Sequence, residues 1–112
     1  MIVRVFTGRV VARREGDFNA NVRARLDQIR QQPGNAYVKF ARKIEGDREV
    51  VMLITEWRTA ADLYAWTDGE VDTPHMVDLD MLEDWQVEHW EALDMSELED
   101  QLPPSGHSVP SG

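Results

Sequence analysis

The segment from Val50 to Trp66 constrains the fold more than any other part of the chain. It begins with five consecutive apolar residues, Val-Val-Met-Leu-Ile, a composition typical of a buried strand. Thr59 and Asp62 then have the spacing of a capping box, which marks the start of a helix. Leu63 and Trp66 lie three residues apart, on the inner face of that helix. The segment therefore predicts a strand that leads directly into a helix carrying a tryptophan on its apolar face.

Strand and helix patterns alternate along the rest of the chain. Between Asp17, a candidate N-cap, and the terminator Pro33-Gly34, apolar residues recur at the spacing of one helix face. In chain order, the predicted elements are a strand over 2–11, a helix after Asp17, strands over 36–44 and 49–57, a helix after Thr59, a short helix from Pro74, and a strand over 85–93.

This β-α-β-β-α-β order predicts an α+β fold, the ferredoxin-like sandwich, with helices on one face of the sheet. The other face offers Phe6, Val38 and Phe40 or their neighbours, which are apolar side chains that need cover. Packing two such sheets together buries these faces and shields the strand edges, so we expect a homodimer that forms a dimeric α+β barrel. We expect one domain over residues 1–95. Residues 96–112 are predicted to form a terminal turn, capped by Ser96 and Glu99, and a disordered tail.

The composition narrows the class of protein. A chain of 112 residues is one domain, and with no cysteine it can form neither a disulfide framework nor a Cys-based metal site. The N-terminus has no basic region of the signal-peptide type, and no run approaches the roughly 18 apolar residues of a membrane span. We therefore expect a soluble cytoplasmic protein with no membrane partner.

Charge is distributed very unevenly. All 12 Lys and Arg residues lie at or before Arg58, where the net charge is +5, and the part from Thr59 onward carries a net charge of −14. The overall acidic excess argues against a nucleic-acid partner, because phosphate binding needs a basic surface. We expect the two parts to face each other within the fold or across a dimer. The alternative is an acidic surface that binds a basic partner.

The run Thr55-Glu56-Trp57, the helix that carries Trp66, and Pro33-Gly34 before the second strand resemble the antibiotic biosynthesis monooxygenase (ABM) domain family. The resemblance covers roughly residues 2–93. It implies the dimeric α+β barrel, and it implies either of two activities found in the family. One is oxygenation of quinol-type substrates without a cofactor, and the other is haem degradation.

The resemblance extends to the haem-degrading branch at two positions. In that branch a tryptophan on the second helix distorts the porphyrin, and a histidine nine or ten residues later binds the iron. Trp66 and His75 have these residue types and this spacing. A neutral imidazole is an ordinary axial ligand of haem. Acidic neighbours, among them Asp72 and Asp78, are expected to favour the protonated ring instead. Thr7 stands where the branch has an asparagine that hydrogen-bonds the iron-bound oxygen.

A cofactor-free monooxygenase needs an apolar aromatic pocket, a base, and donors that hold an anionic substrate. We expect His75 or His89 to act as the base, because histidine titrates near neutral pH. The predicted catalytic residues are His75, Trp66 and Thr7. The residues predicted to contact a small aromatic substrate are Trp57, Tyr64, Tyr37, Phe6 and Arg9.

The preferred hypothesis is this monooxygenase with no dedicated cofactor. Haem binding or degradation, with His75 as the iron ligand, is the alternative. A third hypothesis is a non-catalytic dimeric protein that binds a small ligand, in which Trp66 and His89 are simply core residues. This hypothesis is consistent with the lack of a catalytic triad pattern or a glycine-rich phosphate loop in the sequence.

Overall fold

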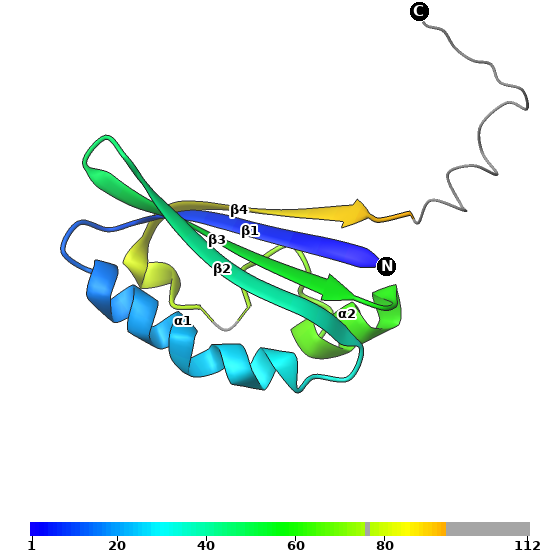
Figure 1. The fold of residues 1–112 in the computed structure, drawn as a ribbon. Helices are drawn as coiled ribbons and strands as arrows, with labels where there is room; N and C mark the ends of the chain where they lie inside the picture. The colour runs from blue at the N-terminus through cyan, green and yellow to red at the C-terminus, as the bar shows by residue number, and fades with distance from the viewer. Residues whose placement is uncertain (76, 94–112) are drawn as a thin grey trace, which may run out of the picture.

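The computed structural model describes residues 1–75 and 77–93. Its elements follow the predicted β-α-β-β-α-β order (Figure 1). They are β1 (Ile2–Val10), α1 (Glu15–Arg30), β2 (Asn35–Glu45), β3 (Arg48–Trp57), α2 (Ala60–Thr67), the 3₁₀ turn η1 (Leu79–Met81) and β4 (Leu82–Glu91). In the described part of the chain no helix is long and apolar enough to cross a membrane.

The four strands form one antiparallel sheet in the order β2-β3-β1-β4. Both helices lie on the same side of this sheet, as Figure 1 shows. The result is the predicted ferredoxin-like α+β sandwich, in which the described residues leave one face of the sheet uncovered. We call these two sides of the sheet the helix face and the open face.

The strand register decides which side chains share each face. Phe6 pairs with Leu53 on β3 and with Val87 on β4, and all three belong to the helix face. Val38 and Phe40 belong to the same face and pack against the core. The expectation that Phe6, Val38 or Phe40 would form the open face is therefore wrong for these three residues. Their neighbours in sequence form it instead, because successive side chains of a strand point to opposite faces.

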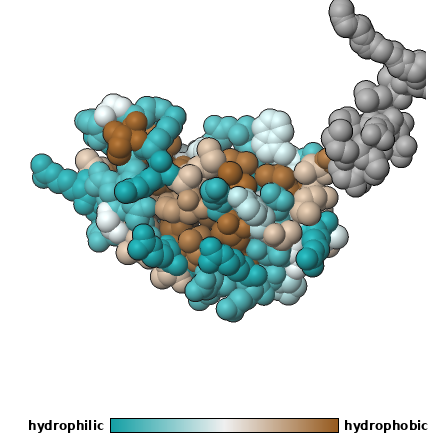
Figure 2. Space-filling view, in the orientation of Figure 1, coloured by the Kyte–Doolittle hydropathy of each residue, from teal (hydrophilic) through white to brown (hydrophobic). Residues whose placement is uncertain are grey.

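The core fills the space between the sheet and the two helices. Figure 2 shows hydrophobic residues gathered in the middle of the visible face, with hydrophilic residues around them. Trp57 and Phe18 are fully buried, and together with the α2 residues Leu63 and Trp66 they join the helices to the sheet. The predicted inner face of the second helix is thereby confirmed.

Local sequence signals predict one helix start correctly and another wrongly. The Thr59 side chain accepts a hydrogen bond from the backbone N–H of Asp62 at 3.1 Å, as the capping-box pattern predicts. Asp17 is not an N-cap, because α1 begins two residues earlier and Asp17 lies in its first turn. The short helix predicted from Pro74 is absent from the described residues of that segment, where only η1 forms one turn. Met76 and the predicted turn and tail after residue 93 lie outside the described residues.

Ion pairs connect the basic and acidic parts of the chain. Arg9 on β1 contacts Asp84 on β4 at 3.3 Å, and Arg48 at the start of β3 contacts Glu83 at 2.9 Å. These are partly exposed pairs, which contribute little to the stability of a fold. They show that the two oppositely charged parts do meet within the fold.

Candidate functional site

An aromatic cluster lies where β3 leads into α2. Trp57 ends the strand and Trp66 lies one helix length later, and their rings stack with centroids 4.9 Å apart at an interplanar angle of 22°. The ring of His75 meets Trp66 edge-on, with centroids 4.9 Å apart and an angle of 78°. Trp66 is only 7% exposed, because these contacts and the sheet surround it. Its indole N–H is buried and has no hydrogen-bond partner in the described part of the chain.

Arg4 is the charged residue at the centre of this region. Strand alternation places it on the helix face beside Phe6, and it is 3% exposed. One guanidinium nitrogen donates to the carbonyl oxygen of Val71 at 2.5 Å, and the other donates to that of Thr73 at 2.6 Å. The guanidinium carbon also lies 5.7 Å from the ring centre of Trp66, within the range of a cation–π contact. Arg4 thus holds the loop between α2 and His75 against the sheet.

His89 on β4 lies opposite Arg4 in the register of β1 and β4. A guanidinium nitrogen of Arg4 and the Nε2 atom of His89 are 2.9 Å apart. Because arginine can only donate, Nε2 accepts this hydrogen bond, and the neutral ring carries its proton on Nδ1. His89 is therefore held in one tautomer by a buried cation.

Burial lowers the pKa values of Arg4, His75 and His89. It lowers the pKa of Arg4 to about 10, against the opposing effect of Asp72, so Arg4 stays charged at neutral pH. Burial, and secondly the charge of Arg4, lower the pKa values of His75 and His89. The acidic residues near His75 raise its pKa by less than burial lowers it. Acidic neighbours therefore act in the expected direction, but burial and Arg4 outweigh them, and the net shift favours the neutral ring of His75.

An apolar hollow of about 190 Å³ opens on the helix face next to Arg4. Two of its wall residues, Val71 and His89, are also hydrogen-bond partners of Arg4. The hollow is lined by Ile2, Ala60, Leu63, Tyr64, Val71 and His89. A hollow of this size suits a one-ring or two-ring molecule, because pockets for drug-sized ligands occupy about 300–1,000 Å³.

The structure divides the predicted site residues between the two faces of the sheet. On the helix face it brings Trp57, Trp66 and His75 together, and it places Tyr64 in the wall of the hollow. Phe6 lies on the same face but is 3% exposed within the core.

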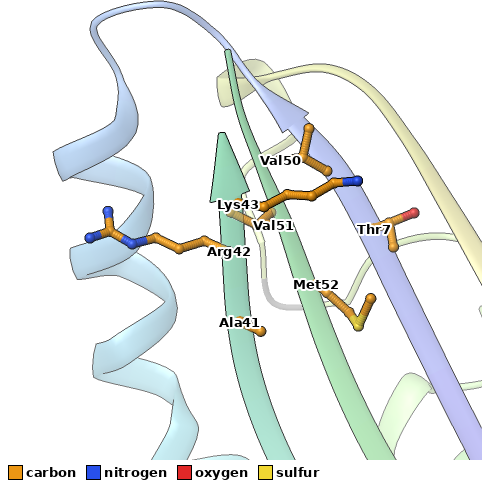
Figure 3. A pocket seen from close by; sticks show the side chains of 7 residues that line it. All are labelled: Thr7, Ala41, Arg42, Lys43, Val50, Val51 and Met52. Carbon is orange, nitrogen blue, oxygen red and sulfur yellow. The ribbon is translucent and has the colours of Figure 1, made fainter. Parts of the chain in front are cut away.

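Thr7, Arg9 and Tyr37 lie on the opposite, open face. Thr7 pairs with Met52 and Gln86 there, so it is not brought together with Trp66 and His75. Figure 3 shows Thr7, Lys43 and Met52 around a separate hollow of about 370 Å³ on that face, while Arg42 points toward α1. The sheet itself separates these residues from the helix-face site.

Arg4 was not predicted as a site residue, although the sequence contains a signal for it. In the first strand, every second residue counted from Phe6 belongs to the buried face. Arg4 is the charged residue among them. A charge at a position whose neighbours on the same face are apolar needs a specific partner or a function.

Comparison with known proteins identifies the family. A family model described as antibiotic biosynthesis monooxygenase matches residues 1–77. The chain belongs to this family. No curated protein matches the chain. Among the described residues, no group of three or more His, Asp or Glu side chains is placed to hold a metal ion.

Several solved structures resemble this ABM chain. One is PA3566 from Pseudomonas aeruginosa, with 14% identity, a TM-score of 0.68, and coverage of 83% of this chain and 94% of that one. Another is described as an antibiotic biosynthesis monooxygenase, with 16% identity, a TM-score of 0.60, and coverage of 84% and 100%. A third is the haem degrader MhuD from Mycobacterium tuberculosis with two haems in its active site, at 17% identity, a TM-score of 0.60, and coverage of 85% and 99%. At these identities the likeness shows the fold alone.

A haem degrader shares the fold of this ABM chain, which raises the question of whether the site fits haem. His75 offers an imidazole with a lowered pKa, which suits an axial ligand. Trp66, however, is already covered, and the adjacent hollow of about 190 Å³ is smaller than ordinary pockets for drug-sized ligands. The described residues supply a possible ligand atom but not the space, so the site as it stands does not fit haem.

Proposed function

We propose that the protein is a small monooxygenase that oxidises an aromatic, quinol-like molecule with dioxygen and without a dedicated cofactor. One observation carries this proposal: an apolar hollow on the helix face has a neutral histidine, His89, in its wall. Membership of the ABM family supports it at the level of reaction class. Written for the keto tautomer of such a molecule, the overall reaction is R₂CH₂ + O₂ → R₂C=O + H₂O, with all of the electrons supplied by the substrate.

The protein's part in this reaction is to bind the substrate and to remove a proton. Ile2, Leu63 and Tyr64 supply apolar and aromatic walls for the ring. A histidine whose pKa is lowered is largely unprotonated at neutral pH and can take the proton. The resulting anion gives its electrons to dioxygen, a C–O bond forms, and cleavage of the O–O bond releases water.

Two histidines are candidates for the base. His89 lines the hollow, whereas His75 packs against the edge of Trp66 and is not one of the wall residues. We assign proton removal to His89, and we assign His75 the role of keeping Trp66 and the loop after α2 in place. This assignment departs from the sequence-based choice of His75 as the primary catalytic residue.

Oxygen consumption tests the proposal. The metal-free protein is supplied with a panel of hydroquinones, naphthols and anthrones, and dioxygen uptake is followed with an electrode. We expect uptake with at least one compound, a loss of about 10²-fold or more in His89→Gln, and a smaller loss in His75→Gln. Equal losses in the two variants would reject the assignment of His89, and no uptake with any compound would reject the activity.

A hemin titration tests the haem alternative, which the edge contact between Trp66 and His75 and the similarity to MhuD favour. We expect no saturable Soret band in the wild-type protein, because Trp66 is 7% exposed. A saturable band at one haem per chain that disappears in His75→Ala would contradict this expectation. In that case, bleaching by added ascorbate would indicate degradation rather than binding alone.

We also propose that the protein acts as a homodimer through its open face. That face carries apolar side chains that are exposed in a single chain, among them Met52 at 37%, Tyr37 at 41% and Trp90 at 59%. Its edges have opposite charges, with Lys39 on β2 and Glu88 on β4. Two copies arranged so that β2 of one meets β4 of the other bury the apolar residues and bring opposite charges together.

A further inference from the structure

Arg4 carries a buried positive charge that has no ion-pair partner in residues 1–75 and 77–93. It donates to two backbone carbonyl groups and to the neutral ring of His89, and its guanidinium lies over Trp66. Asp72 acts on it only through longer-range electrostatics. Carbonyl and imidazole acceptors satisfy the hydrogen bonds of a guanidinium, but they do not neutralise its charge.

An unneutralised charge in this position is costly. Burial disfavours the charged form, which is why the pKa of Arg4 falls to about 10. A chain that keeps such a group on the apolar face of a strand loses stability by doing so. An anion bound next to Arg4 would offset part of this loss of stability. The positive charge of Arg4 would also lower the pKa of the bound ligand and so favour its anionic form.

The hollow on the helix face provides a route to Arg4. Val71 lines it and accepts a hydrogen bond from Arg4 through its carbonyl oxygen. His89 lines it as well, and its Nε2 atom accepts from the other hydrogen of the same nitrogen. A ligand in the hollow thus lies against two residues that Arg4 already binds.

We propose that this hollow binds its aromatic ligand as a phenolate, with Arg4 as the counter-ion. The ligand oxygen takes over the Arg4 hydrogen bond that His89 now accepts, and the phenol proton passes to the freed Nε2 atom. The proposal deepens the proposed function, on which it rests for the place of binding, because it narrows the substrate class to phenols and quinols acidic enough to ionise. Arg4 then determines both the substrate specificity of the hollow and the orientation of the bound ligand.

The other charged groups near the site are carboxylates, whose negative charge opposes the effect of Arg4. Asp72 acts on both Arg4 and His89, while Glu70 and Asp68 act on His75. These carboxylates disfavour an anion in the hollow. Arg4 opposes them with a positive charge that hydrogen-bonds directly to two wall residues.

Binding of 4-nitrophenol under anaerobic conditions tests the proposal, because the absorbance of this probe reports its ionisation. In the wild-type protein we expect saturable binding and a pKa of the bound phenol about one unit or more below that of the free probe. Arg4→Met should abolish the shift, and Arg4→Lys, which keeps the charge, should retain part of it. Circular dichroism confirms that each variant is folded.

The outcomes separate this proposal from the oxygenase activity. No saturable binding, an unchanged or raised pKa of the bound phenol, or an unaltered shift in Arg4→Met would overturn the counter-ion role. If Arg4→Met does not fold, the wild-type titration and Arg4→Lys decide the question. A lowered pKa without dioxygen uptake on any substrate would leave the phenolate site standing and reject only the oxygenation.

Discussion

The imidazole of His75 meets the indole of Trp66 edge-on at a centroid distance of 4.9 Å. Such an edge contact is one of the favourable arrangements of aromatic rings. It places His75, from the irregular loop after α2, against a tryptophan of the core. The two residues are nine positions apart in the sequence. The same contact leaves Trp66 with little exposed surface. Trp66 is therefore a core residue, and it offers little surface to a ligand.

Truncation of Trp66 should therefore destabilise the fold. Trp66→Ala removes a buried indole that is 7% exposed, and we expect a loss of about 3–5 kcal/mol in the free energy of unfolding, measured by urea denaturation. Tyr64→Ala on the same helix is the matched control, because Tyr64 is 52% exposed and its loss should cost far less. If the two variants unfold at the same urea concentration, Trp66 is not part of the core.

Gly34 should tolerate no side chain. Its φ of +80° lies in the left-handed region, and a Cβ there would overlap the side chain of Asp62. Gly46 in the β2–β3 turn has a φ of +65° but open space around it. We expect Gly46→Ala to cost about 1–2 kcal/mol for the backbone conformation alone and Gly34→Ala to cost more. Equal losses in thermal or urea unfolding would show that Asp62 simply moves aside.

These residues also show how far the sequence determines the fold. Alternation in the strands, the Thr59 cap and the Pro33-Gly34 stop predicted the strands and the two α-helices that the described residues form, because each is a local signal. The start of α1 was misplaced because Asp17 resembles a cap but lies in the first turn, where an acidic residue also favours the helix dipole. The helix predicted from Pro74 is absent from the described residues, and in the preceding loop Arg4 binds the carbonyl groups of Val71 and Thr73.

The site was less predictable than the fold. Trp66 and His75 were paired through the family resemblance, and their contact is observed. Thr7 lies on the other face of the sheet from them, because a shift of one residue along a strand changes the face to which a side chain points. The hydrogen bond between Arg4 and His89 joins residues that are 85 positions apart in the sequence. No local sequence pattern indicates such a contact.

Stability should fall as the pH drops below about 6.5, the ordinary pKa of histidine. The pKa values of His75 and His89 are lowered in the folded chain, so between the folded and unfolded values the unfolded chain binds more protons. The free energy of unfolding is therefore greatest above 6.5 and is lost as the pH falls toward the folded-state values. The double variant His75→Gln/His89→Gln should flatten this slope between pH 7.5 and 5.5 in urea unfolding, and an unchanged slope would contradict the lowered pKa values.

Charge substitutions should control dimerisation through the open face. Lys39→Glu and Glu88→Lys each place like charges opposite one another, so we expect each to weaken the dimer in analytical ultracentrifugation. The combined variant restores opposite charges and should recover much of the association. Recovery in the double variant separates a direct charge pair from a loss of folding. A wild-type chain that is monomeric at micromolar concentration would contradict the open-face dimer altogether.

The most direct test of the central claim is the fate of isotopically labelled dioxygen. The metal-free protein is incubated under ¹⁸O₂ with the substrate that gives oxygen uptake, and the product and water are analysed by mass spectrometry. The account predicts one ¹⁸O atom in the carbonyl product and one in water for each dioxygen consumed, with turnover lost in His89→Gln. Formation of hydrogen peroxide with an unlabelled product, or turnover that His89→Gln leaves intact, would contradict a monooxygenase that uses His89 as its base.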